Sequence, residues 1–186
     1  MILPIIGFGA LVLRKKCKYI LEDSDELRIL LENMWETMYA ASGVGLAAPQ
    51  INMDMRLFII DTSPFIEDDE LKVEKAVKKV FINAKIIDES GDEWSFSEGC
   101  LSIPDLREEV SRKSTIKIEY FDQFFVKHTD IYDGLTARVI QHEYDHIEGV
   151  LFIDYITPLR KRMIKGKLTD ISKGKTKTNY KMRFIS

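Results

Sequence analysis

The sequence predicts an α+β domain with an antiparallel sheet, in which strand-like segments are grouped before a single central helix. Three observations support this fold class. Residues 115–121 alternate apolar and charged side chains, residues 135–148 show helical periodicity, and no internal repeat is visible. With 45% hydrophobic and 31% charged residues, the 186-residue chain has an ordinary globular composition, which excludes collagenous and mostly disordered proteins. We expect residues 1–186 to form one domain.

The N-terminal half predicts one helix followed by a strand. Asp23 and Glu26 have the spacing of a capping box, and apolar residues then recur at helical spacing until glycines at 43 and 45 end the helix. Residues 55–61 are predicted to form a strand. The charged segment 63–79 is predicted to be a surface insertion with a helical turn.

The C-terminal half predicts four strands, two helices and a closing strand. Residues 115–121 and 124–132 are expected to pair across a turn at Asp122–Gln123. Gly149 is expected to end the central helix, and Thr157 followed by Pro158 has the signature of a helix start. The predicted segments are strands at 80–88, 93–97, 115–121 and 124–132, helices at 135–148 and 159–168, and a strand at 179–185.

The distribution of charge and the number of cysteines indicate the cellular compartment of the protein and the kinds of partner it can bind. The net charge of −3 conceals a basic tail, residues 160–186, with ten Lys or Arg side chains and one acidic residue. We favour a solvated helix and terminus there, while contact with the ribosome, without nucleic-acid sequence specificity, is the alternative. Two cysteines cannot form a disulfide scaffold, and residues 1–13 are too short and too interrupted to span a bilayer. We expect a soluble cytoplasmic protein that does not contact membranes.

The strongest chemical signal is His142-Glu143-x-x-His146 within the predicted central helix. Residues four apart lie on one helix face, so both imidazoles can bind one metal ion, and Glu143 can face a metal-bound water as general base. The competing interpretation is a pair of surface histidines around a helical glutamate. We favour the metal site because the surrounding helix is amphipathic.

A third ligand is needed to complete the site, and Cys100 is the best candidate. It lies in Ser97–Pro104, which looks like a turn leaving a strand, whereas Cys17 is expected to be buried and inert and His128 to be exposed. Two histidines and one cysteine leave a fourth position open for water, as in catalytic sites. These ligands do not choose among iron, cobalt, nickel and zinc.

The segment Gly43-Val-Gly-Leu-Ala-Ala-Pro-Gln50 is open to two interpretations. Its small residues allow close approach of a substrate, with the Gln50 amide polarising a carbonyl. Alternatively, the segment is a helix stop and tight turn before a strand.

Three motifs in order resemble the signatures of the peptide deformylase family: Gly43–Gln50, Glu98-Gly-Cys-Leu-Ser102 and Gln141-His-Glu-Tyr-Asp-His146. The similarity extends from Ile2 to Leu159. This resemblance implies removal of the formyl group from N-formylmethionyl nascent peptides. It also implies antiparallel sheets around a central helix that carries the metal histidines. The implied cofactor is one divalent ion, foremost Fe²⁺, with Zn²⁺, Ni²⁺ or Co²⁺ as substitutes.

The resemblance also implies roles for individual residues. Glu143 becomes the general acid and base, and Gln50 and the backbone N–H of Leu101 become donors to the oxyanion. The segments 63–79 and 180–185 resemble the longer deformylase type. The implied metal ligands are Cys100, His142 and His146.

A substrate pocket is expected beside this site. Leu135 and Val139 share the helix face of His142 and, with Val44 and Gly45, are candidates to receive a methionine side chain, although ordinary core packing explains Leu135 equally well. Arg107 resembles the family arginine near the peptide backbone, and Arg112 is a candidate partner of Glu98.

Two other functions compete with deformylation. A zincin-type metallopeptidase shares the His-Glu-x-x-His pattern but takes a third ligand downstream, where Glu148 lies too close to His146. A non-catalytic metal-binding adaptor on the ribosome is the second alternative. Formate release from a formyl peptide, compared with cleavage of an internally blocked peptide, separates all three.

Overall fold

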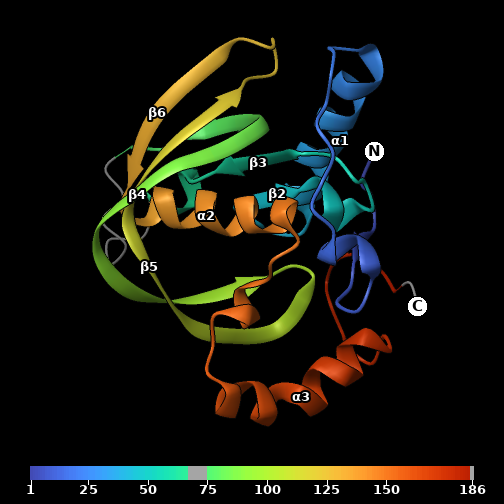
Figure 1. The fold of residues 1–186 in the computed structure, drawn as a ribbon. Coiled ribbons are helices and arrows are strands. Elements are labelled where there is room, and N and C mark those ends of the chain that lie inside the picture. The colour runs from blue at the N-terminus through green and yellow to red at the C-terminus, as the bar shows by residue number, and fades with distance from the viewer. Residues whose placement is uncertain (67–74, 185–186) are drawn as a thin grey trace.

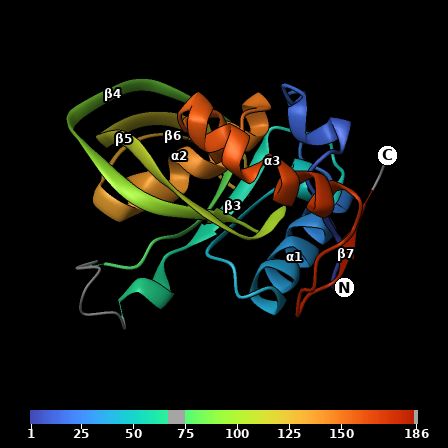
Figure 2. The same ribbon diagram turned by 90° about the horizontal axis from the view of Figure 1, so that it is seen from below.

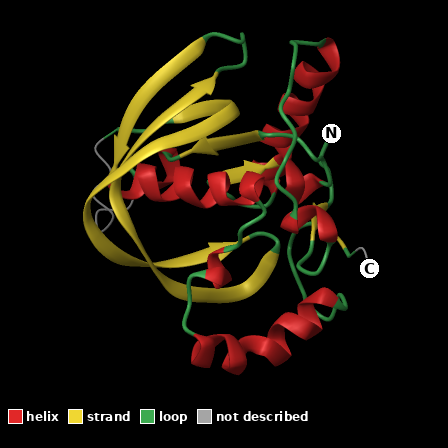
Figure 3. Cartoon of the chain, in the orientation of Figure 1, coloured by secondary structure: helices red, strands yellow, loops and turns green. Residues whose placement is uncertain are grey.

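The computed structural model describes residues 1–66 and 75–184, and Figures 1 and 3 show the arrangement of its helices and strands. Short 3₁₀ helices cover Leu11–Arg14, Ala48–Ile51, Ser63–Phe65 and Phe152–Asp154. The main elements are β1 (Ile5–Ile6), α1 (Asp25–Ala40), β2 (Gly45–Ala47), β3 (Leu57–Asp61), β4 (Lys78–Cys100), β5 (Ile103–Phe121), β6 (Lys127–Asp133), α2 (Gly134–Glu148), α3 (Pro158–Ser172) and β7 (Met182–Arg183).

A five-stranded sheet in the order β2-β3-β4-β5-β6 forms the main layer, and each neighbouring pair is antiparallel. The predicted pairing of the last two strands is confirmed, since Thr115 lies opposite Asp133 and Phe121 opposite Lys127. Their alternation reflects burial: Ile116 and Ile118 have no exposed surface. The α+β class with an antiparallel sheet is therefore confirmed.

Strands β4 and β5 are much longer than their sequence predicts. β4 is one 23-residue strand where two short strands were expected, and β5 has 19 residues and begins at Ile103. Residues 87–93 of β4 are exposed, so this part lacks the apolar alternation that identifies a half-buried strand. Bulges interrupt the β4–β5 register, and the two strands curve round α2 in Figure 1.

Helix α2 is held by the concave side of this sheet. It contacts β2, β3, β5 and β6, and Ala137, Ile140 and Ile147 are completely buried. The predicted end of the helix is confirmed: Gly149 has φ +76°, and a Cβ atom there would lie 2.7 Å from the Arg14 carbonyl oxygen. Packing on several strands fixes the direction of the buried α2 side chains.

The start of α1 corrects the predicted cap. The N-cap is Ser24, whose hydroxyl accepts a hydrogen bond from Leu27 N–H at 3.2 Å, so Asp23 lies one residue outside the helix. Glu26 is in the first turn, where its negative charge suits the helix dipole. Spacing alone could not decide between two adjacent residues that both cap well.

Helix α3 lies apart from the other two helices in Figure 1 and carries much of the basic tail. Thr157 caps it as predicted, accepting a hydrogen bond from Arg160 N–H at 3.3 Å, and the helix continues to Ser172, beyond the expected end. Ile164 and Ile171 are buried while the basic side chains are exposed. Among the described residues, no helix combines the length and apolar character needed to cross a bilayer.

The two chain ends come together in a second, two-stranded sheet. β7 pairs with β1 in parallel, with Met182 opposite Ile5, so this small sheet differs from the antiparallel sheets that were predicted. Figures 1 and 2 show both termini on the same side of the molecule. The predicted helical turn is present at Ser63–Phe65. Residues 67–74 of the predicted insertion and residue 185 of the predicted closing strand lie outside the described residues.

Candidate active site

Three side chains from β4 and α2 form a candidate metal group: Cys100, His142 and His146. One sulfur or nitrogen atom of each lies within 4.8 Å of the other two, and Cys100 Sγ is 3.3 Å from His146 Nε2. The two imidazole centroids are 5.2 Å apart because their residues lie one turn apart on α2. Cys100 reaches them from the end of β4.

This group fits a metal ion in its chemistry as well as its spacing. A thiolate and two imidazoles are ligands that iron and zinc accept, and three protein ligands leave room for water or substrate. His146 is 1% exposed, so its imidazole lies beneath the surface of the site. The residues therefore provide a possible site for a single metal ion.

A buried network of charges orients His142. Glu98 Oε2 lies 3.0 Å from His142 Nδ1, and the same carboxylate accepts two hydrogen bonds from Arg112 at 2.7 and 3.0 Å. Arg138 adds a third at 2.9 Å. Burial opposes ionisation of Glu98, but hydrogen bonds from His142 and Arg112 outweigh it and lower its pKa well below the ordinary value. With Nδ1 facing a carboxylate, His142 presents Nε2 to the candidate metal group.

Glu143 lies beside this group, next to His142 on α2. Among the described residues, nothing hydrogen-bonds its buried Oε2 atom. Burial raises the pKa of Glu143 to about 7, despite the opposing influence of His142. Gly45 makes room for the carboxyl group, because a Cβ atom at that position would lie 2.5 Å from Glu143 Oε1. A carboxyl group poised near neutral pH can accept and return a proton.

Gln50 presents an amide N–H to the same space. Its Oε1 accepts a hydrogen bond from Ala47 N–H at 2.8 Å, which assigns the opposite side of the amide as Nε2. Nε2 lies 3.6 Å from Cys100 Sγ and 3.4 Å from Ser102 Oγ. Gln50 is 1% exposed, so its orientation is fixed by packing and by Ala47. The donor group is thus held beside the candidate metal group.

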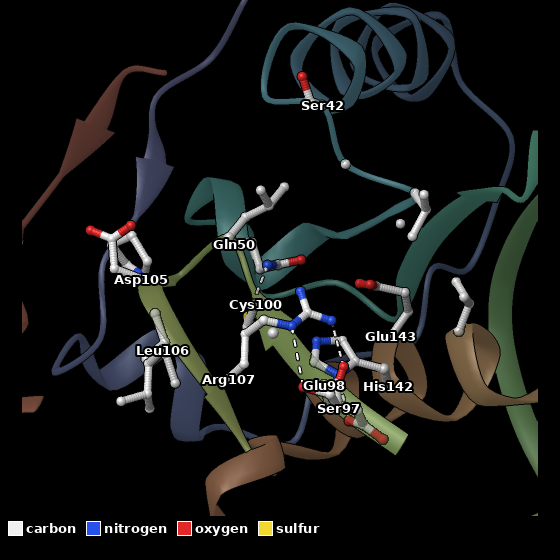
Figure 4. A pocket seen from close by; sticks show the side chains of 18 of the residues that line it. Ser42, Gln50, Ser97, Glu98, Cys100, Asp105, Leu106, Arg107, His142 and Glu143 are labelled. Atoms are coloured by element: carbon white, nitrogen blue, oxygen red, sulfur yellow. Dashed lines mark hydrogen bonds and ion pairs between the residues drawn. The ribbon is translucent and has the colours of Figure 1, made fainter. Parts of the chain in front are cut away.

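A cavity of about 880 Å³ opens onto these residues, and Figure 4 shows many of the side chains that line it. His146, buried below, is the one predicted site residue that the lining does not include. Arg107 is exposed and bonds to the Ser97 carbonyl oxygen. The predicted residues that line the cavity are Val44, Gly45, Gln50, Cys100, Leu101, Arg107, Leu135, Val139, His142 and Glu143.

The residues that were judged poor candidates for metal ligands have other contacts in the structure. His128 on β6 lies 2.8 Å from Asp122, and Glu148 bonds Arg56 at 2.6 Å, so neither belongs to the candidate metal group. Cys17 is buried in the core, where desolvation raises the pKa of its thiol to about 11. The structure therefore confirms Cys17 as a buried core residue and offers no downstream ligand at Glu148.

Sequence reasoning missed two contributors. In the sequence, Arg138 is a single charged residue within an amphipathic helix. In the structure it is 2% exposed and donates hydrogen bonds to the Glu98 carboxylate and to the carbonyl oxygens of Val110 and Trp94. Its spacing of four residues from His142 was the available signal. The second is the C-terminal segment Lys177–Tyr180, which lines the cavity although it is far from every motif in the sequence.

An α+β fold that gathers one sulfur and two imidazole nitrogen atoms beside a buried glutamate is the arrangement expected of a metal-dependent hydrolase. The sequence model of the family described as polypeptide deformylase matches residues 2–162. The chain belongs to the peptide deformylase family.

Individual relatives agree with this assignment. The peptide deformylase of Christiangramia forsetii is 58% identical over 189 residues, covering 99% of this chain and 96% of the relative. That of Flavobacterium johnsoniae is 56% identical and covers 100% of this chain and 97% of the relative. A crystal structure of a peptide deformylase from Legionella pneumophila has a TM-score of 0.81 and 34% identity, covering 94% of this chain and 98% of that one.

Family membership establishes the reaction. The protein is a hydrolase of protein biosynthesis that removes the N-terminal formyl group from nascent peptides. The family is metal-dependent, in agreement with the candidate metal group. Deformylation therefore holds over the peptidase and adaptor alternatives.

Proposed function

We propose that Cys100, His142 and His146 hold the catalytic metal ion and that α2 is the central helix carrying this site. The observation that carries the proposal is the approach of their ligand atoms to within 4.8 Å of one another. A bound divalent cation there would acidify a water molecule and polarise the formyl carbonyl. We propose Fe²⁺ as the native ion, with Zn²⁺, Ni²⁺ or Co²⁺ as substitutes, since one thiolate and two imidazoles suit all four.

Glu143 is the proposed general acid and base. Its unpartnered Oε2 atom and its pKa of about 7 allow it to take a proton from the attacking water and pass it to the amine nitrogen as the C–N bond breaks. The products are formate and a peptide with a free N-terminus. One carboxyl group is enough for both roles, because it accepts the proton from water as the base and later donates the same proton to the amine as the acid.

Gln50 and the backbone N–H of Leu101 are the proposed donors to the oxyanion that forms when the formyl carbon is attacked. The fixed Gln50 amide reaches the cavity beside Cys100, and Leu101 follows Cys100 directly in the chain. Donors that are already in place stabilise developing charge without reorganising during the reaction.

Replacement of Gln50 by alanine is expected to lower kcat by about 10²–10³-fold, because one oxyanion donor is lost. Metal content should be unchanged, since Gln50 is not a proposed ligand. Steady-state kinetics of formate release, with metal analysis of the same sample, measure both. Gln123→Ala, at an exposed turn residue, is the matched control. A metal-loaded Gln50→Ala variant with the wild-type kcat would rule out the proposed role.

Replacement of Glu98 by glutamine is expected to weaken metal affinity by about 10–100-fold, because the carboxylate that orients His142 loses its charge. Competition with a metal-binding dye measures the affinity directly. Glu108→Gln is the matched control, because Glu108 is also buried and paired with an arginine, Arg160, at 2.6 Å. Equal metal affinity in Glu98→Gln and wild type would contradict the orienting role.

The cavity is proposed to receive the formylmethionine residue. Val44, Gly45, Leu135 and Val139 would contact its side chain, and Arg107 would lie near the peptide backbone. A cavity of about 880 Å³ is large enough for residues beyond the methionine as well.

The decisive assay compares two substrates with anaerobically prepared, iron-loaded protein. Formate release from formyl-Met-Ala, with no cleavage of an internally blocked peptide, is the expected result. Cleavage of the blocked peptide alone would point to a zincin-type peptidase, and absence of both activities to a binding protein. Metal analysis of the anaerobic sample identifies the native ion.

We further propose that residues 1–186 act as one catalytic domain in the cytoplasm, where nascent chains emerge. The exposed basic side chains of α3 would provide transient contact with the ribosome through charge, without reading a nucleic-acid sequence. Sedimentation with ribosomes at low and high salt tests this contact, since binding by exposed charges weakens as salt rises.

A further inference from the structure

Both carbonyl groups of the Leu101–Ser102 turn are bonded to the ends of the chain. The Tyr180 hydroxyl donates to the Leu101 carbonyl oxygen at 2.8 Å, and Phe8 N–H donates to the Ser102 carbonyl oxygen at 2.8 Å. Phe8 closely follows β1 and Tyr180 closely precedes β7, and these two strands pair with each other. The two-stranded sheet of the termini thus holds the turn that follows Cys100.

The turn has a geometry that benefits from such support. Cys100 lies opposite Ile103, so Leu101 and Ser102 are the two turn residues between β4 and β5. Two-residue hairpins favour turns with positive φ, because those turns match the twist of the strands. Neither Leu101 nor Ser102 has a positive φ. Contacts from outside the hairpin therefore help to fix the peptide planes that carry the Leu101 and Ser102 carbonyl groups, and with them the backbone dihedrals of the turn.

Tyr180 is itself firmly placed. Ile5 N–H bonds the Lys181 carbonyl at 2.9 Å and Gly7 N–H bonds the Arg183 carbonyl at 3.0 Å, so the backbone on the C-terminal side of Tyr180 is fixed by β1. The ring is half-buried and lines the cavity. Burial, and then the nearby Cys100 and Asp105, raise the pKa of the Tyr180 phenol to about 12. The hydroxyl is thus a hydrogen-bond donor at physiological pH.

We propose that Tyr180 is a positioning residue for deformylation: its hydroxyl holds the Leu101–Ser102 peptide plane through the Leu101 carbonyl. This contact restrains the backbone at Leu101, so that the N–H of the preceding Cys100–Leu101 peptide plane stays directed at the oxyanion. This rests on the proposed role of the Leu101 N–H. Tyr180 lies beyond residues 2–162, the part of the chain matched by the family's sequence model. The C-terminal segment thereby contributes to catalysis through its contact with the Leu101 backbone. A backbone contact of this kind leaves no pattern of side chains in the sequence.

Tyr180→Phe tests the proposal because it removes the hydroxyl and keeps the ring. We expect kcat for formyl-Met-Ala to fall about threefold to tenfold, the kinetic equivalent of one neutral hydrogen bond, with KM changed by less than about twofold. Tyr132→Phe is the matched control, since its hydroxyl bonds Asp130 at 3.1 Å, away from the cavity. The control should keep the wild-type kcat and KM.

A second measurement is independent of turnover. In zinc-loaded protein, which is diamagnetic, the backbone amide order parameter of Leu101 is expected to fall in Tyr180→Phe from the rigid range near ~0.85 toward ~0.6, and to be unchanged in Tyr132→Phe. If wild-type protein released no formate, the proposed function would fail, while this measurement would still test whether Tyr180 holds the turn.

Three outcomes would overturn the proposal. A raised KM with unchanged kcat would make Tyr180 a substrate contact. Unchanged kcat together with an unchanged order parameter at Leu101 would show that the turn does not need the hydroxyl. A lower melting temperature with wild-type kcat would make the hydrogen bond a contribution to stability alone.

Discussion

Replacement of Glu143 by glutamine is expected to lower kcat for formate release by about 10²–10⁴-fold, the range of a lost general acid–base group. Glutamine has nearly the same shape but cannot take up a proton. The carboxyl group is buried at the edge of the cavity beside the candidate metal group, and no described residue hydrogen-bonds its Oε2 atom, so no neighbouring group stands ready to replace it. The reaction should therefore lose both proton transfers that we assign to this residue.

The controls for Glu143→Gln separate proton transfer from metal binding. Metal content should equal that of the wild type, because Glu143 is not a proposed ligand. Glu119→Gln, which changes the same group on β5 where it pairs with Lys127 at 3.3 Å, should keep full activity. Wild-type turnover by fully metal-loaded Glu143→Gln protein would assign proton transfer to another group.

Replacement of Cys100 by alanine is expected to abolish activity and metal binding together. The candidate metal group would keep two imidazoles, and two ligands do not hold a catalytic ion of this kind. Metal analysis after dialysis and a formate-release assay measure the two losses. The melting temperature should also fall and stop responding to added metal, because a ligand that binds the folded state stabilises it.

Cys17→Ala is the matched control for Cys100→Ala. Cys17 is likewise a free cysteine, but it packs in the core and lies outside the candidate metal group. Its removal should cost about 1 kcal/mol of stability through lost packing, with metal content and kcat unchanged. Tight metal binding by Cys100→Ala protein would show that a different residue supplies the third ligand.

Local patterns were sufficient for the helices and for the candidate ligands. Helical periodicity correctly placed α2, and the spacing of His142 and His146 predicted that their side chains share one face. The resemblance in three ordered motifs then indicated the family and its reaction. Most of the candidate site could therefore be predicted, because these signals lie within segments of a few residues.

Strand lengths could not be predicted in the same way. Much of β4 is exposed, so its sequence shows no alternation, and its extended form depends on pairing with β5. The parallel pairing of β1 with β7 joins residues near opposite ends of the chain. Such hydrogen bonds are decided by which segments the fold brings together, and no local pattern records them.

By itself, the sequence determined the fold class, α2 with its two histidines and glutamate, and Cys100 as the companion of the histidines. The tertiary structure alone decided that Arg138 joins Arg112 on Glu98, and that Tyr180 reaches the Leu101 carbonyl. The physical reason is the separation along the chain of the residues that interact. A helix fixes the relation of residues four apart, whereas a buried charge network and a contact between residues 101 and 180 exist only after distant segments have packed.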